Sequence, residues 1–504
     1  MPEKLNRKTF VTKALMVLGG VALIPGLSSG DAKRRIVYSG NDEVNDDGSF
    51  KLNDQSIIDL HCHPSMKMWL FDKKFWKQHL FVHKGDNLLP MQENNHQFSF
   101  GNVRGILAAH YLLEAATERE WNTLKALYPI IKLIPFFDLK DKIEYESEKN
   151  FDQVIKMIDL LEKQIGYTNA IQKDFKYYIA KNFKEFAAAL DDPKKKTIAI
   201  AHAIEGSHAL GRNFPISAKR QNDNTLNNAT QGKMYKAAAT EPWEPYINNL
   251  RKFKERGVCL ITLAHFFRND LVYPVDGISP DAKNTPGMTW EYTPDQDHGL
   301  TEIGKKVVEE MLRTGIVVDV CHSAPGVRRD VFLLNRKMNA ERLMANKPMR
   351  PIVFTHTGAR QIFDYYDLGH YPYFKYYCVS DDEIDLISEC EGVIGVIPEN
   401  FWLVGADTHL KKDFQPSQFR YGIDYMVQTM KYINSKTRLK DYSNIGIGTD
   451  FDGLADNPKD LYKNRQISDL IAAMKRDPEL NQKDYIDNIT YKNSRRILER
   501  GWGN

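Results

Sequence analysis

The chain alternates between short apolar runs and longer stretches in which apolar and polar residues recur at helical spacing. Each apolar run is rich in Val and Ile and ends in a polar or ionisable residue. Eight such runs occur, the second of them the weakest, at residues 57–60, 103–109, 197–204, 258–264, 315–321, 351–355, 392–397 and 444–449. Continuous apolar runs of this kind are typical of strands that are buried on both faces of a parallel sheet.

Amphipathic stretches between these runs predict helices at residues 151–165, 246–256, 300–314, 381–390 and 421–434. Eight strand–helix units in series predict an α/β fold, a closed (β/α)8 TIM barrel. The region from Ile57 onward exceeds the ~250 residues of a plain barrel, so it must carry insertions. These fall at residues 64–100, 207–241, 270–297 and 361–377, and each follows a predicted strand. We therefore expect them to form long loops on the active-site face.

The first 30 residues have the order of an export signal. A basic stretch at residues 4–13 precedes an apolar run at residues 14–27, and small residues follow it. The sequence NRKTFVTK resembles a twin-arginine signal, with Lys8 where the second arginine would stand. We therefore predict a signal peptide at 1–30, a polar linker at 31–55 and one barrel domain at 56–504, in an exported protein that is periplasmic or secreted. The alternative for residues 1–30 is an amphipathic N-terminal helix.

Composition excludes several classes of partner. The formal charge of the 504-residue chain is +3, and residues 1–30 account for all of it, so the remaining body is neutral. A neutral body gives no support for nucleic-acid binding, which needs a basic face. Five cysteines without a CxxC pair predict neither a disulfide framework nor a zinc finger. After signal removal we expect no stable membrane span, because no other apolar stretch approaches the required length.

Ionisable residues follow most of the predicted strands. Because the carboxyl ends of barrel strands meet at one cavity, these side chains should converge. A lone histidine at a strand end is more often a hydrogen-bonded structural residue, and a lone glutamate is often a helix cap. Several together predict a nitrogen and oxygen ligand set for two zinc-like divalent ions. The five candidate ligands are His61, His63, Glu205, His322 and His356, and further strands end in His265 and Asp450.

At this point the chain resembles the membrane dipeptidase (renal dipeptidase) family, peptidase family M19, within the amidohydrolase-like barrels. The matching segments are, in the family's order, IIDLHCHP, TIAIAHAIEGSHAL, GVCLITLAHFFRND, GIVVDVCHSA, RPIVFTHTGA and IGIGTDFDGL. The resemblance implies a dipeptidase with two zinc ions, in which a metal-bridging hydroxide attacks the peptide bond. By analogy with that family, a homodimer is one candidate assembly.

The resemblance also implies roles for individual residues. His61 and His63 would hold the first ion, Glu205 would bridge both ions, and His322 and His356 would hold the second. His265 would contact substrate and stabilise the tetrahedral intermediate. Asp450 would handle a proton or orient the attacking water.

Two departures from the family's pattern bear on substrate and metal. The family usually has HxD at the first strand, whereas this chain has His61-Cys62-His63. The family's arginine that binds the substrate carboxylate is replaced by Tyr377-Cys378, neither of which can form a bidentate cationic clamp. Arg360 is the candidate substitute.

Three other functions remain open at this point. The first is a related hydrolase on the same barrel that acts on a lactone, a cyclic amide, an N-acyl amide or a phosphoester. The second is a mononuclear deaminase-like hydrolase, in which Glu205 would not bind metal. The third is a non-catalytic exported binding protein, which would not need a complete ligand set.

Overall fold

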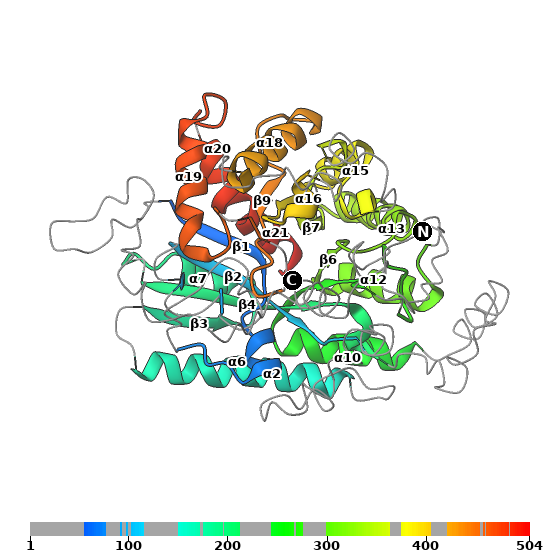
Figure 1. Ribbon diagram of the computed structural model, residues 1–504. Helices are drawn as coiled ribbons and strands as arrows, with labels where there is room; N and C mark the ends of the chain where they lie inside the picture. The colour runs from blue at the N-terminus through cyan, green and yellow to red at the C-terminus, as the bar shows by residue number, and fades with distance from the viewer. Residues whose placement is uncertain are drawn as a thin grey trace, which may run out of the picture.

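The computed structural model contains a closed barrel of eight parallel strands surrounded by helices (Figure 1). It describes residues 55–76, 91–92, 97–98, 102–114, 150–171, 175–194, 196–211, 243–266, 269–275, 299–362, 374–404, 421–453, 457–458, 460–482 and 484–503. The barrel strands are β1 (Ile57–Cys62), β2 (Val103–Tyr111), β4 (Thr197–Glu205), β5 (Val258–Thr262), β6 (Val317–Asp319), β7 (Ile352–Thr357), β8 (Val393–Val396) and β9 (Ile445–Ile447). Pairing of β2 with β4 and of β1 with β9 closes the ring. The predicted (β/α)8 barrel is confirmed.

A ninth strand, β3 (Lys176–Ala180), was not predicted from the sequence. It pairs with the first half of β4, whereas β5 pairs with the second half of β4 from His202 onward. The side chains of β3 alternate between exposed and buried, because it lies at the edge of the barrel wall. It therefore lacks the continuous apolar run that marks the eight barrel strands.

The five predicted helices are present, with ends shifted by a few residues: α6 (Asn150–Ile171), α10 (Glu244–Glu255), α12 (Glu302–Thr314), α15 (Asp381–Glu389) and α18 (Tyr421–Lys436). Further helices are α2 (Met66–Phe71), α7 (Phe183–Leu190), α13 (Pro325–Met344), α16 (Asn400–Val404), α19 (Ile467–Arg476), α20 (Tyr485–Asp487) and α21 (Asn493–Gly501). Helix α13 has a weak apolar periodicity because its buried face includes Arg328, Asn335 and Asn339.

Local capping explains where two of the helices begin and end. Thr301 accepts a hydrogen bond from the backbone N–H of Gly304 and so starts α12, which ends at Gly315 in a left-handed conformation. Ser380 and Glu383 form a reciprocal capping box at the start of α15. Both helices therefore begin within two residues of their predicted positions.

The core has two layers. Side chains of the barrel interior, such as Leu107, Leu260 and Val353, form one apolar cluster, and helices α7 and α21 contribute to the same cluster. Phe186 of α7 and Trp502 beside α21 lie with their rings 6.1 Å apart. A larger cluster packs the outer helices against the barrel wall. Helices α7 and α21 therefore pack against the barrel interior, away from the strand ends that carry the ionisable residues.

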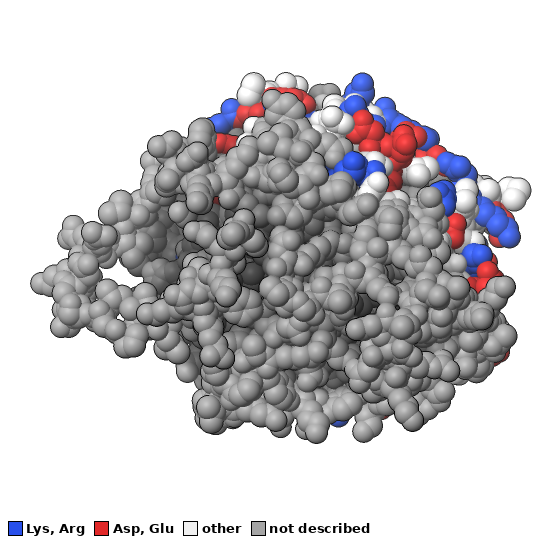
Figure 2. Space-filling view, turned by 45° about the vertical axis from the view of Figure 1, so that its right-hand side comes forward, with Lys and Arg blue, Asp and Glu red and all other residues white. Residues whose placement is uncertain are grey.

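Residues 1–54, with the predicted signal and nearly all of the predicted linker, lie outside the described residues, as do most of the four predicted insertions. Among the described helices, none has the length and apolar character needed to cross a membrane. Basic and acidic side chains are interspersed over the described part of the surface in Figure 2.

Candidate metal centre

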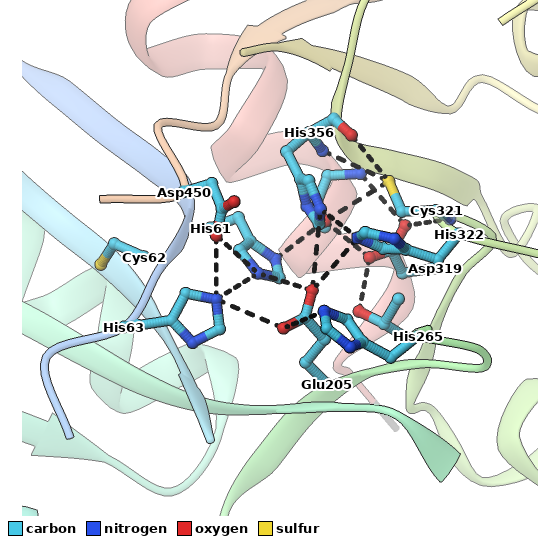
Figure 3. Close-up of polar contacts among 12 residues, drawn as sticks. His61, Cys62, His63, Glu205, His265, Asp319, Cys321, His322, His356 and Asp450 are labelled. Carbon is cyan, nitrogen blue, oxygen red and sulfur yellow. Dashed lines mark hydrogen bonds and ion pairs between the residues drawn. The ribbon is translucent and has the colours of Figure 1, made fainter. Parts of the chain in front are cut away.

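The ionisable residues at the strand ends meet around one carboxylate, that of Glu205 at the end of β4 (Figure 3). We call this set the Glu205 cluster; its members are His61, His63, Glu205, His265, His322, His356 and Asp450. All are buried apart from Asp450, whose side chain is 16% exposed. The structure thus brings together the five predicted ligands and the two further predicted site residues.

The first half of the cluster comes from β1 and from the loop after β9. The Nε2 atoms of His61 and His63 lie 3.1 Å apart. His63 Nε2 is 3.3 Å from Glu205 Oε2 and 3.0 Å from Asp450 Oδ1. Figure 3 shows the Cys62 sulfur pointing away from the cluster, because side chains alternate between the two faces of an extended strand.

The second half of the cluster comes from the ends of β6 and β7. The Nε2 atoms of His322 and His356 lie 2.9 Å apart. Both lie near the other oxygen of the Glu205 carboxylate, at 3.5 Å and 3.6 Å from Oε1. His61 Nε2 is also 3.3 Å from Oε1, so the carboxylate lies between the two histidine pairs, with Oε1 near three imidazoles and Oε2 near His63 and His265.

The backbone conformation at the strand ends orients these side chains toward the cluster. His322 and Asp450 have φ values of 60° and 51°, in the left-handed region that non-glycine residues seldom adopt. Gly206 has a φ of 89°, and a Cβ atom there would lie 2.3 Å from the His208 ring. Only glycine fits directly after Glu205, because any side chain would be both strained and blocked.

The charge distribution depends on burial and on Glu205. Burial raises the pKa of Glu205, but the surrounding imidazoles, of which His265 and His61 act most strongly, hold that pKa well below its usual range. Burial lowers the pKa of His61, yet the charge of Glu205 outweighs burial and raises it to about 9. Burial, reinforced by His61, lowers the pKa of His356 well below its usual value. Glu205 is therefore ionised, and His356 is neutral, the form in which imidazole binds a metal.

The donor set fits two divalent ions. Groups of three ligand atoms converge at His61, His63 and Asp450 and again at Glu205, His322 and His356. Two nitrogens that bind one zinc ion tetrahedrally, each at about 2.0–2.1 Å, lie about 3.3 Å apart, close to the spacing within each pair. Imidazole and carboxylate ligands suit zinc and also manganese, iron or cobalt.

His265 has a different environment from the four paired histidines. Its Nε2 lies 3.6 Å from Glu205 Oε2, and its Nδ1 lies 3.3 Å from Glu114 Oε2. The Tyr111 hydroxyl donates to the same Glu114 oxygen at 2.9 Å, and its ring packs 4.0 Å from the His265 ring. Sequence reasoning missed Tyr111 and Glu114, because the predicted strand 103–109 ended before them.

A layer of hydrogen bonds behind the cluster was also missed. Asp319 Oδ2 accepts hydrogen bonds from the hydroxyls of Thr262 and Thr355, each at 2.6 Å. Thr355 Oγ1 also lies 3.0 Å from His61 Nδ1 and 3.0 Å from His356 Nδ1. In the sequence these residues sit inside apolar runs, where nothing distinguishes them from ordinary strand residues.

Arg360, the predicted substitute for the carboxylate-binding arginine, is not brought to the Glu205 cluster by any contact within the described residues. Its Nη2 lies 3.4 Å from the Cys378 carbonyl oxygen and 3.6 Å from Glu383 Oε2, and its guanidinium lies over the Tyr376 ring. The charge of Arg360 is therefore directed at Glu383.

Two aromatic side chains cover the second half of the cluster. The Trp402 ring stacks on His356, with centroids 5.7 Å apart, and Tyr377 stacks on Trp402 at 5.2 Å. Both also pack edge-on against the His322 ring. Tyr377, in place of the expected arginine, thus presents an aromatic surface beside His322 and His356.

Comparison with known proteins identifies relatives of this architecture. The family model for membrane dipeptidase, peptidase family M19, matches residues 237–501, just over half of the chain. An uncharacterized dipeptidase of Schizosaccharomyces pombe is 26% identical over 225 residues, which is 45% of this chain and 42% of that protein. Dipeptidase aclJ of Aspergillus oryzae is 25% identical over 44% of this chain and 40% of its own length. The chain thus spans less than half the length of these two relatives.

A solved structure shows the same fold over a longer span. A metallopeptidase from Rhodobacter sphaeroides, liganded with a phosphinate mimic of the dipeptide L-Ala-D-Ala, has a TM-score of 0.58 and 16% identity. The alignment covers 89% of this chain and all of that one. His61, His63 and Glu205 lie outside the family-model match, so their place in the site rests on the geometry described above.

Proposed function

Since the chain belongs to the membrane dipeptidase family, peptidase family M19, we propose that it is a metal-dependent hydrolase that cleaves the peptide bond of dipeptides with two bound divalent ions. One observation carries the proposal: the Glu205 carboxylate lies between two pairs of imidazoles. Its Oε2 is 3.3 Å from His63 Nε2, and its Oε1 is 3.3 Å from His61 Nε2 and 3.5 Å and 3.6 Å from the Nε2 atoms of His322 and His356. A carboxylate in that position can bridge two ions.

The ions and the protein would supply different parts of the hydrolytic chemistry. Two divalent ions held by these ligands would polarise the scissile carbonyl and lower the pKa of a water to near neutrality. The protein supplies the ligands, and the buried position of Glu205, only 2% exposed, excludes bulk water. Low local polarity strengthens every charge interaction in the site.

His265 is placed to stabilise an oxyanion. Its Nδ1–H faces the Glu114 carboxylate, which leaves Nε2 directed into the cluster. Burial lowers the pKa of His265, but Glu205 and Glu114 outweigh burial and raise it. When the ring carries both protons, one is held by Glu114 and the other can be donated from Nε2 to the developing oxyanion.

Asp450 is placed to handle a proton. It is the one partly exposed carboxylate of the cluster, and its Oδ1 lies 3.0 Å from His63 Nε2. From there it can take a proton from the attacking water and pass it to the leaving amine. The same distance also makes it a candidate ligand of the first ion.

A second substrate class is favoured by the surface formed by Tyr377 and Trp402. An aromatic wall beside His322 and His356 suits an apolar group better than a free carboxylate, and Arg360 is directed at Glu383. The second candidate is therefore a related hydrolase acting on an N-acyl amide, a cyclic amide, a lactone or a phosphoester.

We further propose export of the protein to the periplasm or medium, supported by the pattern of residues 1–30. Cell fractionation with an antibody against the barrel tests this. Recovery in the cytoplasm would contradict it.

The test of the hydrolase proposal combines metal counting with a substrate panel. Zinc-loaded protein is assayed on L-L and L-D dipeptides, each with a free or an amidated C-terminus, with Glu205→Gln as the blank. Two zinc ions per chain and turnover of free dipeptides support the first candidate, and turnover confined to the amidated dipeptides supports the second. One ion per chain would favour a mononuclear hydrolase, and no metal-dependent turnover of any of these classes would sink the proposal.

A further inference from the structure

One hydroxyl group lies between the two halves of the Glu205 cluster. Thr355 Oγ1 is 3.0 Å from His61 Nδ1 and 3.0 Å from His356 Nδ1, and 2.6 Å from Asp319 Oδ2. His61 belongs to the first pair of predicted ligands and His356 to the second. Thr355, His356 and Asp319 are fully buried and His61 is 1% exposed, so bulk water does not compete for these bonds.

Counting protons fixes the direction of each hydrogen bond. A threonine hydroxyl has one proton to donate and two lone pairs that accept. Both oxygens of Asp319 accept hydrogen bonds, Oδ1 from the backbone N–H groups of Cys321 and Thr355 and Oδ2 from the hydroxyl of Thr262. The Thr355 proton therefore goes to Asp319, and both imidazoles donate their Nδ1–H to Thr355. In each ring this leaves Nε2 as the nitrogen available to a metal ion.

The Nε2 atoms point where that assignment requires. His61 Nε2 faces His63 Nε2, and His356 Nε2 faces His322 Nε2. By contrast, the Nδ1 atoms of His63 and His322 have no hydrogen-bond partner among the described residues. Each pair therefore contains one imidazole whose Nδ1 is hydrogen-bonded to Thr355 and one whose Nδ1 has no such partner among the described residues.

We propose that Thr355, backed by Asp319, is a positioning residue that sets the metal-binding nitrogen of His61 and His356 at once and so couples the two ion positions. This inference rests on the proposed binuclear centre. A hydrogen bond from the non-ligating nitrogen of a metal-bound histidine fixes its ring orientation and raises its basicity. Here one hydroxyl serves both ions, so its loss should weaken both together.

An ion bound directly by His61, His356 and Asp319 is the competing arrangement, since their ligand atoms also converge. The Thr355 hydroxyl lies within 3.0 Å of an atom of all three and already satisfies each of them. The three groups therefore converge because each forms a hydrogen bond with Thr355. The ions would bind on the opposite side of the two rings, at Nε2.

Thr262 provides a matched control. It is buried like Thr355 and donates to the same Asp319 oxygen at the same 2.6 Å, and among the described residues its side chain forms no hydrogen bond with an imidazole. Replacing either threonine by valine removes one hydroxyl from Asp319. Only the Thr355 change removes the acceptor of the two imidazoles.

The experiment measures zinc affinity at both positions by chelator competition, together with the visible spectrum of the cobalt-substituted protein. We expect Thr355→Val to weaken both positions by about 10–100-fold and to alter the cobalt spectrum. Thr355→Ser, which keeps the hydroxyl, should restore both, and Thr262→Val should stay within about 3-fold of wild type. An equal loss in Thr262→Val, no loss in Thr355→Val, or a loss confined to one position would each overturn the inference.

Two features keep this test decisive. If wild-type protein binds fewer than two ions, the binuclear proposal fails on its own, before any variant is compared. If Thr355→Val does not fold, nitrogen NMR of histidine-labelled, zinc-loaded wild type replaces it. The inference is supported if both His61 and His356 carry a proton on Nδ1 and their Nε2 signals have the chemical shift of a metal-bound nitrogen. A metal-bound Nδ1 in either ring contradicts it.

Discussion

Two sets of buried imidazoles lie on opposite sides of the same barrel wall. The Glu205 cluster lies in the barrel mouth, whereas His110 of β2 and His202 of β4 contact helix α6 on the outside. His110 Nδ1 is 2.9 Å from Ser65 Oγ, His110 Nε2 is 2.9 Å from His202 Nδ1, and His202 Nε2 is 3.4 Å from Glu162 Oε1. We call this row the outer histidine chain.

The difference lies in how the nitrogens meet. In the outer histidine chain the contacts run in one line, from the Ser65 hydroxyl through the two imidazoles to the Glu162 carboxylate. In the mouth, Nε2 atoms face each other in two pairs around a carboxylate, and the Nδ1 atoms of His61 and His356 both lie 3.0 Å from the Thr355 hydroxyl. The first arrangement places each ring nitrogen beside a protein group of its own line, whereas the second leaves paired nitrogens in the orientation that a metal ion between them would use. Buried histidines alone therefore do not indicate a metal site; the orientation of their nitrogens does.

Removing one imidazole from each set gives the largest contrast. We expect His356→Asn to weaken zinc binding by more than about 100-fold and to reduce turnover to that of Glu205→Gln. Loss of a residue that only hydrogen-bonds to a metal ligand already costs about 10–100-fold in metal affinity. His202→Asn should keep both ions and lose about 1–3 kcal/mol of folding stability, because its buried partners lose a hydrogen bond. Metal analysis and urea unfolding of both variants provide the check; zinc loss in His202→Asn would refute the distinction.

Within the mouth, His265 should behave unlike the paired histidines. It has Glu114 as its Nδ1 partner and no facing imidazole nitrogen within hydrogen-bond distance among the described contacts. His265→Asn should therefore retain two ions and lower kcat by about 100–1000-fold, the usual cost of one oxyanion donor. Steady-state kinetics alongside metal content measure this, and an ion missing from the variant would instead make His265 a ligand.

Glu114 tests whether His265 depends on a negative partner. Glu114→Gln keeps the size of the side chain but removes the charge that favours the doubly protonated ring. We expect kcat to fall by about 10-fold, less than the ~100–10,000-fold that a positioned acid or base contributes, because His265 itself remains. The alkaline limb of the pH profile, on which His265 loses its proton, should shift to lower pH. Tyr111→Phe, which removes the other donor to the same oxygen, is the control and should leave that limb in place.

The outer histidine chain gives the smallest effect. The hydrogen bond with His202 acts against burial and, with Arg256, lowers the pKa of Glu162 to about 2. A depressed acid pKa stabilises the fold above the unfolded value near 4.5 and loses that effect as pH falls through about 2. Glu162→Gln should thus cost about 1 kcal/mol at neutral pH after solvent screening, and the difference from wild type should disappear toward pH 2. Unfolding of metal-free protein across pH measures it; a constant difference would contradict the assignment.

The barrel was predictable because eight of its strands are buried on both faces and interrupt the helical periodicity. Strand β3 was not, because its half-exposed KYYIA pattern resembles many surface segments. The histidines and Glu205 could be proposed because strand ends of a parallel barrel converge. Thr355, Asp319 and Glu114 could not, because their roles follow from side-chain directions at a few ångströms, which spacing along the chain does not encode.

Strand β1 pairs with β9, and α21 packs into the same cluster as the barrel interior. These contacts determine when the barrel can be completed during synthesis. Ile497, Leu498 and Trp502 belong to the same cluster as Ile58 and Leu60 of the first strand. These contacts join residues more than 430 positions apart, so a chain emerging from the ribosome cannot complete its barrel until α21 has been made. Because such distant contacts form slowly, the nascent chain has no finished interior before α21 has been made. His61 and His63 are therefore made before the other members of the Glu205 cluster, and their final setting is completed last.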